Sequence, residues 1–222
     1  GARVTFSALI ESAVVRKKFA VLWEAARTVA SVGVRNRATL VGNICSAIPC
    51  LDSGPPLLVY EAVVVTCGPA GVRRIPITEW FTGVKQTACR ADELVTCVEL
   101  PLPAKHGGCY VKLGRYAGED LAQVGLGIMA CAGGEYRVAH CAVAPVPRRM
   151  TGVEALLAGQ ELTPALIKRA CARAAKEISP IADVRATKEY RQHMSGIMLA
   201  RGLATAVARL AGGGPAYGTS LL

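Results

Sequence analysis

The strongest constraint on the fold is a cluster of helix and strand breakers near the middle of the chain. The segment Pro101-Leu102-Pro103-Ala104-Lys105-His106-Gly107-Gly108 combines two prolines with two glycines. Such a segment interrupts any regular element. Strand-like runs lie on both sides of it, and helical patterns lie toward both ends of the chain. The sequence therefore predicts two α+β units that divide near residues 101–109, with the first at 1–104 and the second at 107–222.

Composition excludes several classes of protein. The chain has 222 residues and is 52% hydrophobic, which supplies a core and excludes intrinsic disorder. Its apolar runs are shorter than the roughly 20 residues that a spanning helix needs, so no membrane span is predicted. The net charge of +10 is spread along the sequence, and aromatic residues make up only 5%. Because a nucleic-acid site needs clustered basic residues, we expect no nucleic-acid partner, although a surface for acidic proteins stays open.

Periodicity predicts the elements of the first unit. Apolar residues at helical spacing favour one amphipathic helix over residues 14–30, with Ser12 as its N-cap. Residues 31–56 hold many breakers and are expected to form a loop. Residues 63–67 and 73–76 predict a β-hairpin, and another strand is expected near 93–100.

The second unit shows strands first and helices afterwards. Strand-like runs occupy residues 110–113, 122–131 and 135–143, and Gly133-Gly134 marks a tight turn between the last two. Thr163 and Pro164 suit the N-cap and first residue of a helix, and a longer helix is expected around residues 190–204. We predict a three-stranded antiparallel sheet packed on helices.

One loop combines residue types that suit ligand binding. In the stretch Arg35-Asn36-Arg37-Ala38-Thr39-Leu40-Val41-Gly42-Asn43-Ile44, a hydroxyl, a glycine and an amide follow one another closely. Backbone NH groups there can approach a ligand, although plain turns also use Gly-Asn. Asp52 follows nine residues later. It has two interpretations that stay open at this point, an N-cap for the next short helix or an acceptor for a ligand hydroxyl.

Taken together, these stretches form an ordered set of motifs. The set contains Arg35-Asn36-x-Ala38-Thr39-x-x-Gly42-Asn43, Pro49-x-x-Asp52, Asp92-Glu93-Leu94 before Leu100-Pro101, Lys112-x-x-Arg115 before Asp120-Leu121-Ala122, Ala144-Pro145-Val146-Pro147-Arg148-Arg149, and Pro180-Ile181-x-Asp183-x-Arg185-Ala186-Thr187-x-x-Tyr190-Arg191. In order and spacing it resembles the FAD-binding subunit of molybdenum hydroxylases, the family of the xanthine dehydrogenase and aerobic carbon monoxide dehydrogenase medium subunits. The resemblance implies the second half of a two-subdomain FAD-binding domain, with a mixed sheet and helices, followed by the flavoprotein C-terminal domain.

The resemblance also implies a function and partners. A large partner subunit would hydroxylate the substrate at a molybdopterin centre, and a small partner subunit would carry two [2Fe–2S] clusters. FAD on this chain would collect the electrons for NAD, oxygen, a quinone or another acceptor, in a cytoplasmic complex. The chain itself would supply no catalytic acid or base. The alternative is a non-catalytic scaffold that binds partners and has an incomplete flavin site.

By resemblance, nine residues would bind the cofactor. Asp52 would accept a hydrogen bond from FAD, Leu94 would contact the flavin, and the Lys112 cation would favour the reduced ring from near its edge. The second FAD loop would comprise Ala38, Thr39, Leu40, Val41, Gly42 and Asn43. Tyr116 is a further candidate for a flavin neighbour, with an exposed loop aromatic as the alternative.

Two departures from the family pattern affect this site. Family members begin earlier, with a glycine-rich loop that holds the FAD pyrophosphate. We therefore expect residues 1–222 alone to hold FAD poorly, and a preceding segment or a separate N-terminal FAD segment to complete the site. The second departure is Val41, where the family has glycine. Its Cβ restricts the backbone and hinders close approach at that position.

The histidines and cysteines carry no metal-binding pattern. The three histidines lack metal spacing, and His140 suits a hydrogen-bonded position on a strand. The nine cysteines are odd in number and include no Cys-x-x-Cys pair.

We expect all nine cysteines to be free thiols that bind no metal, as is usual for cysteines in a reducing cytoplasm. Thiol titration of the denatured, unreduced chain should count nine, and elemental analysis should find no iron stoichiometric with this chain. A disulfide-linked peptide in a non-reducing digest would contradict the prediction.

Overall fold

The computed structural model describes residues 1–116 and 119–222. The helices are α1 (Phe6–Glu11), α2 (Ala13–Lys18), α3 (Ala20–Arg27), α4 (Val32–Arg35), α5 (Leu40–Ser46), α6 (Gly54–Val59), α7 (Ile77–Trp80), α8 (Thr151–Leu157), α9 (Pro164–Ala174) and α10 (Lys188–Leu210). The strands are β1 (Val63–Gly68), β2 (Gly71–Pro76), β3 (Phe81–Gly83), β4 (Gln86–Thr87), β5 (Leu94–Glu99), β6 (His106–Leu113), β7 (Val124–Cys131), β8 (Tyr136–Cys141) and β9 (Arg148–Arg149). Within this part of the chain, no helix is both long and apolar enough to span a membrane.

The first predicted helix is interrupted. Ser12 caps α2 as expected, because its Oγ accepts a hydrogen bond from Val15 N at 3.3 Å. Phe19 then leaves the helical conformation (φ −129°, ψ 49°) and separates α2 from α3. Its ring packs edge-on against Tyr60, with ring centroids 5.2 Å apart. The prediction of one continuous helix over residues 14–30 is therefore wrong, because core packing fixes Phe19 outside helical geometry.

The segment expected to be a loop contains short helices. Two hydroxyls cap them: Ser31 Oγ accepts from Val34 N at 3.4 Å, and Thr39 Oγ1 accepts from Gly42 N at 2.9 Å. Since these side chains satisfy NH groups that a helix start leaves open, α4 and α5 form despite the nearby glycines. The prediction of an irregular segment over residues 31–56 is wrong in this respect.

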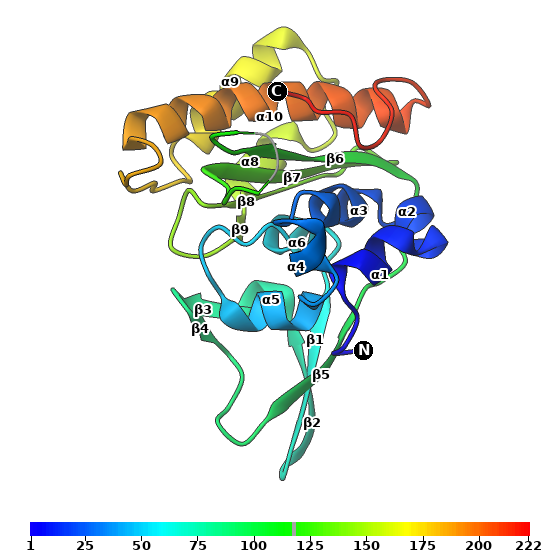
Figure 1. Ribbon diagram of the computed structural model, residues 1–222. Coiled ribbons are helices and arrows are strands. Elements are labelled where there is room, and N and C mark those ends of the chain that lie inside the picture. The colour runs from blue at the N-terminus through cyan, green and yellow to red at the C-terminus, as the bar shows by residue number, and fades with distance from the viewer. Residues whose placement is uncertain (117–118) are drawn as a thin grey trace.

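The predicted hairpin is confirmed. Strands β1 and β2 pair antiparallel, and Gly71 at the turn has a φ of +102°, which favours glycine. Strand β5 pairs antiparallel with the other edge of β1 and completes a three-stranded sheet. This sheet projects away from the helices at the bottom of Figure 1.

The second unit is built on an antiparallel sheet in the order β6-β7-β8-β9. The three predicted strands are confirmed, and the two-residue β9 adds a short fourth strand. Gly133 and Gly134 both have positive φ at the predicted turn. Thr163 caps α9 with Pro164 in its first turn, also as predicted.

This sheet is covered on both faces. Helix α10 lies across one face, while α3 and α6 of the first unit lie against the other (Figure 1). Every residue of β7 is buried as a result. The division near residues 101–109 stays a prediction, but His106, Gly107 and Gly108, which were expected to interrupt regular structure, lie within β6. Both halves of the chain pack on the β6–β8 sheet.

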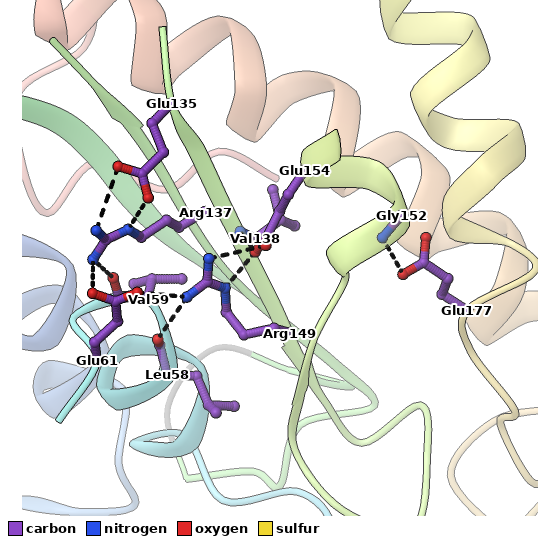
Figure 2. Close-up of polar contacts among 10 residues, drawn as sticks. All are labelled: Leu58, Val59, Glu61, Glu135, Arg137, Val138, Arg149, Gly152, Glu154 and Glu177. Carbon is purple, nitrogen blue, oxygen red and sulfur yellow. Dashed lines mark hydrogen bonds and ion pairs between the residues drawn. The ribbon is translucent and has the colours of Figure 1, made fainter. Parts of the chain in front are cut away.

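Ion pairs and hydrogen bonds join the C-terminal end of α6 to strands β8 and β9 (Figure 2). The guanidinium of Arg137 donates to Val59 O at 3.2 Å, and that of Arg149 donates to Leu58 O at 3.5 Å. Glu61 lies against both guanidiniums, and Glu154 pairs with Arg149. Cations at the carbonyl end of a helix are favourable, so these arginines of the second unit fix α6 of the first.

A second polar contact between the two units is buried at Glu24, beside α10. Glu24 on α3 accepts hydrogen bonds from Tyr110 N and Gly218 N, each at 2.8 Å, and forms an ion pair with Arg209 at 3.0 Å. Arg209 also donates to Gly108 O at 2.7 Å. Burial raises the pKa of Glu24, while its hydrogen bonds and Arg209 oppose that rise. Helix α3, strand β6, helix α10 and the C-terminal tail meet at this carboxylate.

We expect Gly107→Ala to lower the free energy of unfolding by about 3 kcal/mol, or the melting temperature by about 6–12 °C. A Cβ at Gly107 would lie 2.2 Å from Leu210 N and 2.3 Å from Ala206 O, so β6 would be pushed away from the α10 backbone. Gly33→Ala is the control, because nothing lies within 4 Å of its added Cβ. Equal melting temperatures for both variants, by scanning calorimetry, would contradict this packing.

Candidate functional site

The stretch over residues 38–43, expected as a loop, leads into α5 and forms its first turn from Leu40 onward. This 38–43 loop is held in place by the start of the chain. Phe6 N donates to Ala38 O at 3.0 Å, and Leu40 N donates to Val4 O at 3.1 Å. The same N-terminal segment reaches β5, where Ala2 N donates to Thr96 O at 2.8 Å. The loop and the β1-β2-β5 sheet are therefore linked through residues 2–6.

Within this loop the side chains divide between core and surface. Leu40 and Val41 are buried, whereas Gly42 is exposed. The Val41 side chain points into the protein, so among residues 40–42 only Gly42 is exposed to an approaching ligand. The Thr39 hydroxyl already serves as the acceptor for Gly42 N, so its acceptor capacity is partly used.

Asp52 lies at the centre of a buried polar cluster. Tyr110 Oη donates to Asp52 Oδ1 at 2.7 Å, and Lys112 Nζ donates to Asp52 Oδ2 at 2.9 Å. Lys112 Nζ also donates to Thr28 O at 2.8 Å. The side chains of Asp52 and Lys112 are each only 9% exposed. The structure thus brings together two residues that lie sixty positions apart in the sequence.

The N-cap interpretation of Asp52 is wrong. Ser53 occupies the N-cap position of α6, and no side chain caps that helix through a hydrogen bond. Ser53 Oγ instead donates to Asn43 Oδ1 at 2.6 Å. The Asp52-Ser53 pair therefore connects the loop at Asn43 to strand β6.

Burial and neighbouring charges act on Asp52 in opposite directions. Burial raises the pKa of the Asp52 carboxyl, whereas Lys112 and the Tyr110 hydroxyl lower it. Burial beside this carboxylate also raises the pKa of Tyr110 well above its ordinary value. The phenol therefore remains protonated at neutral pH and serves as a hydrogen-bond donor.

A hollow of about 470 Å³ opens next to this cluster. Ala38, Asn43 and Asp52 line it from the first unit, and Arg115 and Tyr116 line it from the second. Lys112 lines an adjoining hollow of similar size, and Tyr116 lines both hollows.

Leu94 is separate from these residues. It is 78% exposed at the start of β5, where it pairs with Cys67 near the hairpin turn. It lines neither of the two hollows described above.

Sequence reasoning missed Tyr110, Ser53 and Thr28. A signal for Tyr110 was present, because it precedes Lys112 by two positions on a strand and so faces the same side of the sheet. Ser53 and Thr28 carried no comparable signal. They contribute through a hydroxyl and a backbone carbonyl, which the fold alone brings to this place.

The remaining candidates show no metal chemistry. His140 is 1% exposed, and its Nδ1 contacts no partner among the described residues, so the expectation of a hydrogen-bonded strand histidine is wrong at this nitrogen. Burial, reinforced by Arg148, lowers the pKa of His140 to about 4. All nine cysteines are unpaired. Residues 1–116 and 119–222 hold no group of three or more potential metal ligands.

Comparisons with known proteins identify the family. Residues 1–103 match the family described as the FAD-binding domain in molybdopterin dehydrogenase, and residues 109–206 match the CO dehydrogenase flavoprotein C-terminal domain. The carbon monoxide dehydrogenase medium chain of Hydrogenophaga pseudoflava is 32% identical over 95% of this chain and 75% of that protein. The chain belongs to the FAD-binding subunits of the molybdenum hydroxylase family.

Other members agree with this assignment. The xanthine dehydrogenase FAD-binding subunit of Escherichia coli O157:H7 is 29% identical over 96% of this chain and 75% of that protein. The solved structure of H. pseudoflava carbon monoxide dehydrogenase, in a form that lacks the Mo-pyranopterin moiety of its cofactor, matches with a TM-score of 0.90 and 33% identity. That match covers 94% of this chain and 74% of the solved chain. The family resemblance and the α+β fold class are confirmed, and the chain is of the oxidoreductase-subunit type.

We expect Lys112→Met to lower the free energy of unfolding by about 3 kcal/mol at pH 8, because it leaves the Asp52 carboxylate buried without its cation. The loss should be smaller at pH 5. An acid whose pKa is raised by folding is favoured in the folded state at low pH, and that advantage is lost as pH rises through the folded pKa.

Melting temperatures of the wild-type protein and of Lys112→Met at the two pH values check this prediction. Lys105→Met is the control, since it removes the same charge from an exposed position. A Lys112→Met deficit that is equal at pH 5 and pH 8 would contradict the coupling between the two groups.

Proposed function

We propose that this chain carries FAD and transfers electrons within a molybdenum hydroxylase complex. The chemistry that bound FAD supplies is the reversible uptake of two electrons, with release singly or as a pair. Family membership supports the cofactor, and the polar cluster around Asp52 supports its placement. The chain contributes by positioning the cofactor and by setting the charge around it.

The proposed contacts follow the chemistry of each side chain. The loop of Ala38, Thr39, Leu40, Val41, Gly42 and Asn43 would meet the diphosphate and ribityl parts of FAD. Two features suit such a ligand: Gly42 is exposed and has no Cβ, and the side-chain nitrogen Nδ2 of Asn43 donates to no described residue. Asp52 would accept a hydrogen bond from the cofactor, since each of its oxygens receives one donor and retains acceptor capacity.

Charge and exposure support the other two positions. Lys112 would place a cation near the flavin, where it favours an anionic reduced ring. Leu94 would contact the flavin through its exposed side chain and strand backbone. Residues 2–6 form hydrogen bonds with both the 38–43 loop and β5, so these two regions belong to one connected part of the fold.

We further propose the partners and setting. A large subunit would hold the molybdopterin, a small subunit would hold the [2Fe–2S] clusters, and electrons would leave for NAD or another acceptor. A separate N-terminal FAD segment that supplies the glycine-rich pyrophosphate loop would complete the cofactor site. A cytoplasmic setting is supported by nine cysteines that form no disulfide.

In the assembled complex, Asp52→Asn should weaken FAD binding by about ten- to a hundredfold, because a hydrogen bond to a charged acceptor becomes one to a neutral amide. Visible absorbance after ultrafiltration measures the retained flavin. Glu177→Gln is the matched control, since Glu177 accepts from Gly152 N (Figure 2) and pairs with Arg173, away from Asp52. Equal flavin retention in the two variants would contradict the placement at Asp52. Absence of bound flavin from the wild-type complex would favour a non-catalytic scaffold.

A further inference from the structure

The Tyr110 hydroxyl has no role in the function described above, although it lies at the centre of the site. We propose that Tyr110 is a positioning residue, whose hydroxyl holds the Asp52 carboxylate in the orientation that meets FAD. This inference rests on the proposed function of Asp52. It assigns the task to the hydroxyl alone and not to the aromatic ring.

The geometry around Asp52 supports this assignment. Tyr110 Oη and Lys112 Nζ donate to different oxygens of the carboxylate, at 2.7 and 2.9 Å. With one donor on each oxygen, the carboxylate plane cannot rotate without breaking a hydrogen bond. Lys112 alone would leave rotation free about the remaining bond, because its ammonium is a point charge on a flexible stem.

Neighbouring strands leave space for this hydroxyl. Gly125 on β7 pairs with Lys112 on β6 and with Cys141 on β8. A Cβ at Gly125 would lie 2.7 Å from Tyr110 Oη and 2.5 Å from Cys141 Sγ. The phenol therefore occupies a position that any side chain at Gly125 would obstruct. That fit places Oη beside Asp52 without displacing the sheet.

The groups around Asp52 support a single donor of this kind. Lys112 and Tyr110 face it from β6, while Cys50 lies on the segment before α6 and Cys141 lies on β8. Burial raises the pKa of both thiols, so they are neutral at pH 7. Arg115, Glu119, Asp120 and Arg185 line the hollow next to the cluster. Among the described residues, only Tyr110 and Lys112 donate side-chain hydrogen bonds to the carboxylate.

The same core contains a second buried tyrosine, which allows the loss of a hydroxyl in general to be distinguished from its loss at Tyr110. Tyr60 is 2% exposed, and its Oη accepts from Val21 N at 3.2 Å and contacts His106 Nε2 at 3.3 Å. Among the described residues, no hydrogen bond joins it to Asp52. Tyr60→Phe is therefore a matched control that removes one buried hydroxyl from the same core.

The experiment compares Tyr110→Phe with Tyr60→Phe in the assembled FAD-containing complex. FAD dissociation is measured by ultrafiltration and flavin fluorescence from pH 5.5 to pH 9, and melting temperatures record the cost to stability. Tyr110→Phe should weaken FAD binding by about tenfold at pH 7, as expected for one lost hydrogen bond to a charged group. Its acid limb of FAD loss should move to higher pH, because the Asp52 carboxyl loses a donor that favours its ionised form. Tyr60→Phe should change neither.

A double variant tests whether the effect acts through Asp52. Tyr110→Phe should weaken FAD binding no further once Asp52→Ala is present, since the hydroxyl then has no acceptor to orient. Additive losses would overturn the proposal, as would a Tyr110→Phe pH profile equal to that of Tyr60→Phe. If Asp52→Asn itself retains FAD normally, the proposed function of the site fails, which is a different result from failure of the Tyr110 step alone.

Discussion

The β6–β7–β8 sheet must bury both of its faces, and the rest of the molecule is arranged to satisfy that requirement. Helix α10 covers one face, and α3 and α6 cover the other (Figure 1). Because the second cover comes from the first unit, the two halves of the chain form one packed structure. Gly107 permits direct contact with α10, where any Cβ would meet helix backbone. Burial of apolar surface on this sheet is the main force that joins the halves.

Polar groups at the junction then fix its geometry. Apolar packing is non-directional, whereas hydrogen bonds and ion pairs have defined geometry. Glu24 connects α3 to β6, α10 and the tail, and the arginines of β8 and β9 hold the end of α6. The N-terminal end of α6 follows directly after Asp52 and Ser53. The arginines that fix the C-terminal end of this helix therefore also help to position the candidate cofactor site. Asp52 in turn pairs with Lys112 on the shared sheet, which places the site at the seam between the units.

Much of the fold could be predicted because its signals are local. The hairpin, the turn at Gly133-Gly134 and the start of α9 depend on residues within a few positions of one another. The break at Phe19 could not be read in this way, since its cause is contact with Tyr60 forty-one positions away. The helices within residues 31–56 were missed for another reason. Their glycines and prolines outweighed the capping hydroxyls in the pattern, although single caps suffice for helices this short.

The sequence by itself determined the family motifs, the β1-β2 hairpin and the strands of the central sheet, and the residue types available for a cofactor. It placed Asp52 and Lys112 in separate motifs, and for Asp52 it left a helix N-cap open as the structural alternative. Only the tertiary structure decided that these two charges are buried together and that Tyr110 completes the cluster. The physical reason is range: capping, turns and periodicity act between near neighbours, whereas the cost of a buried charge is offset by partners that folding brings from distant positions.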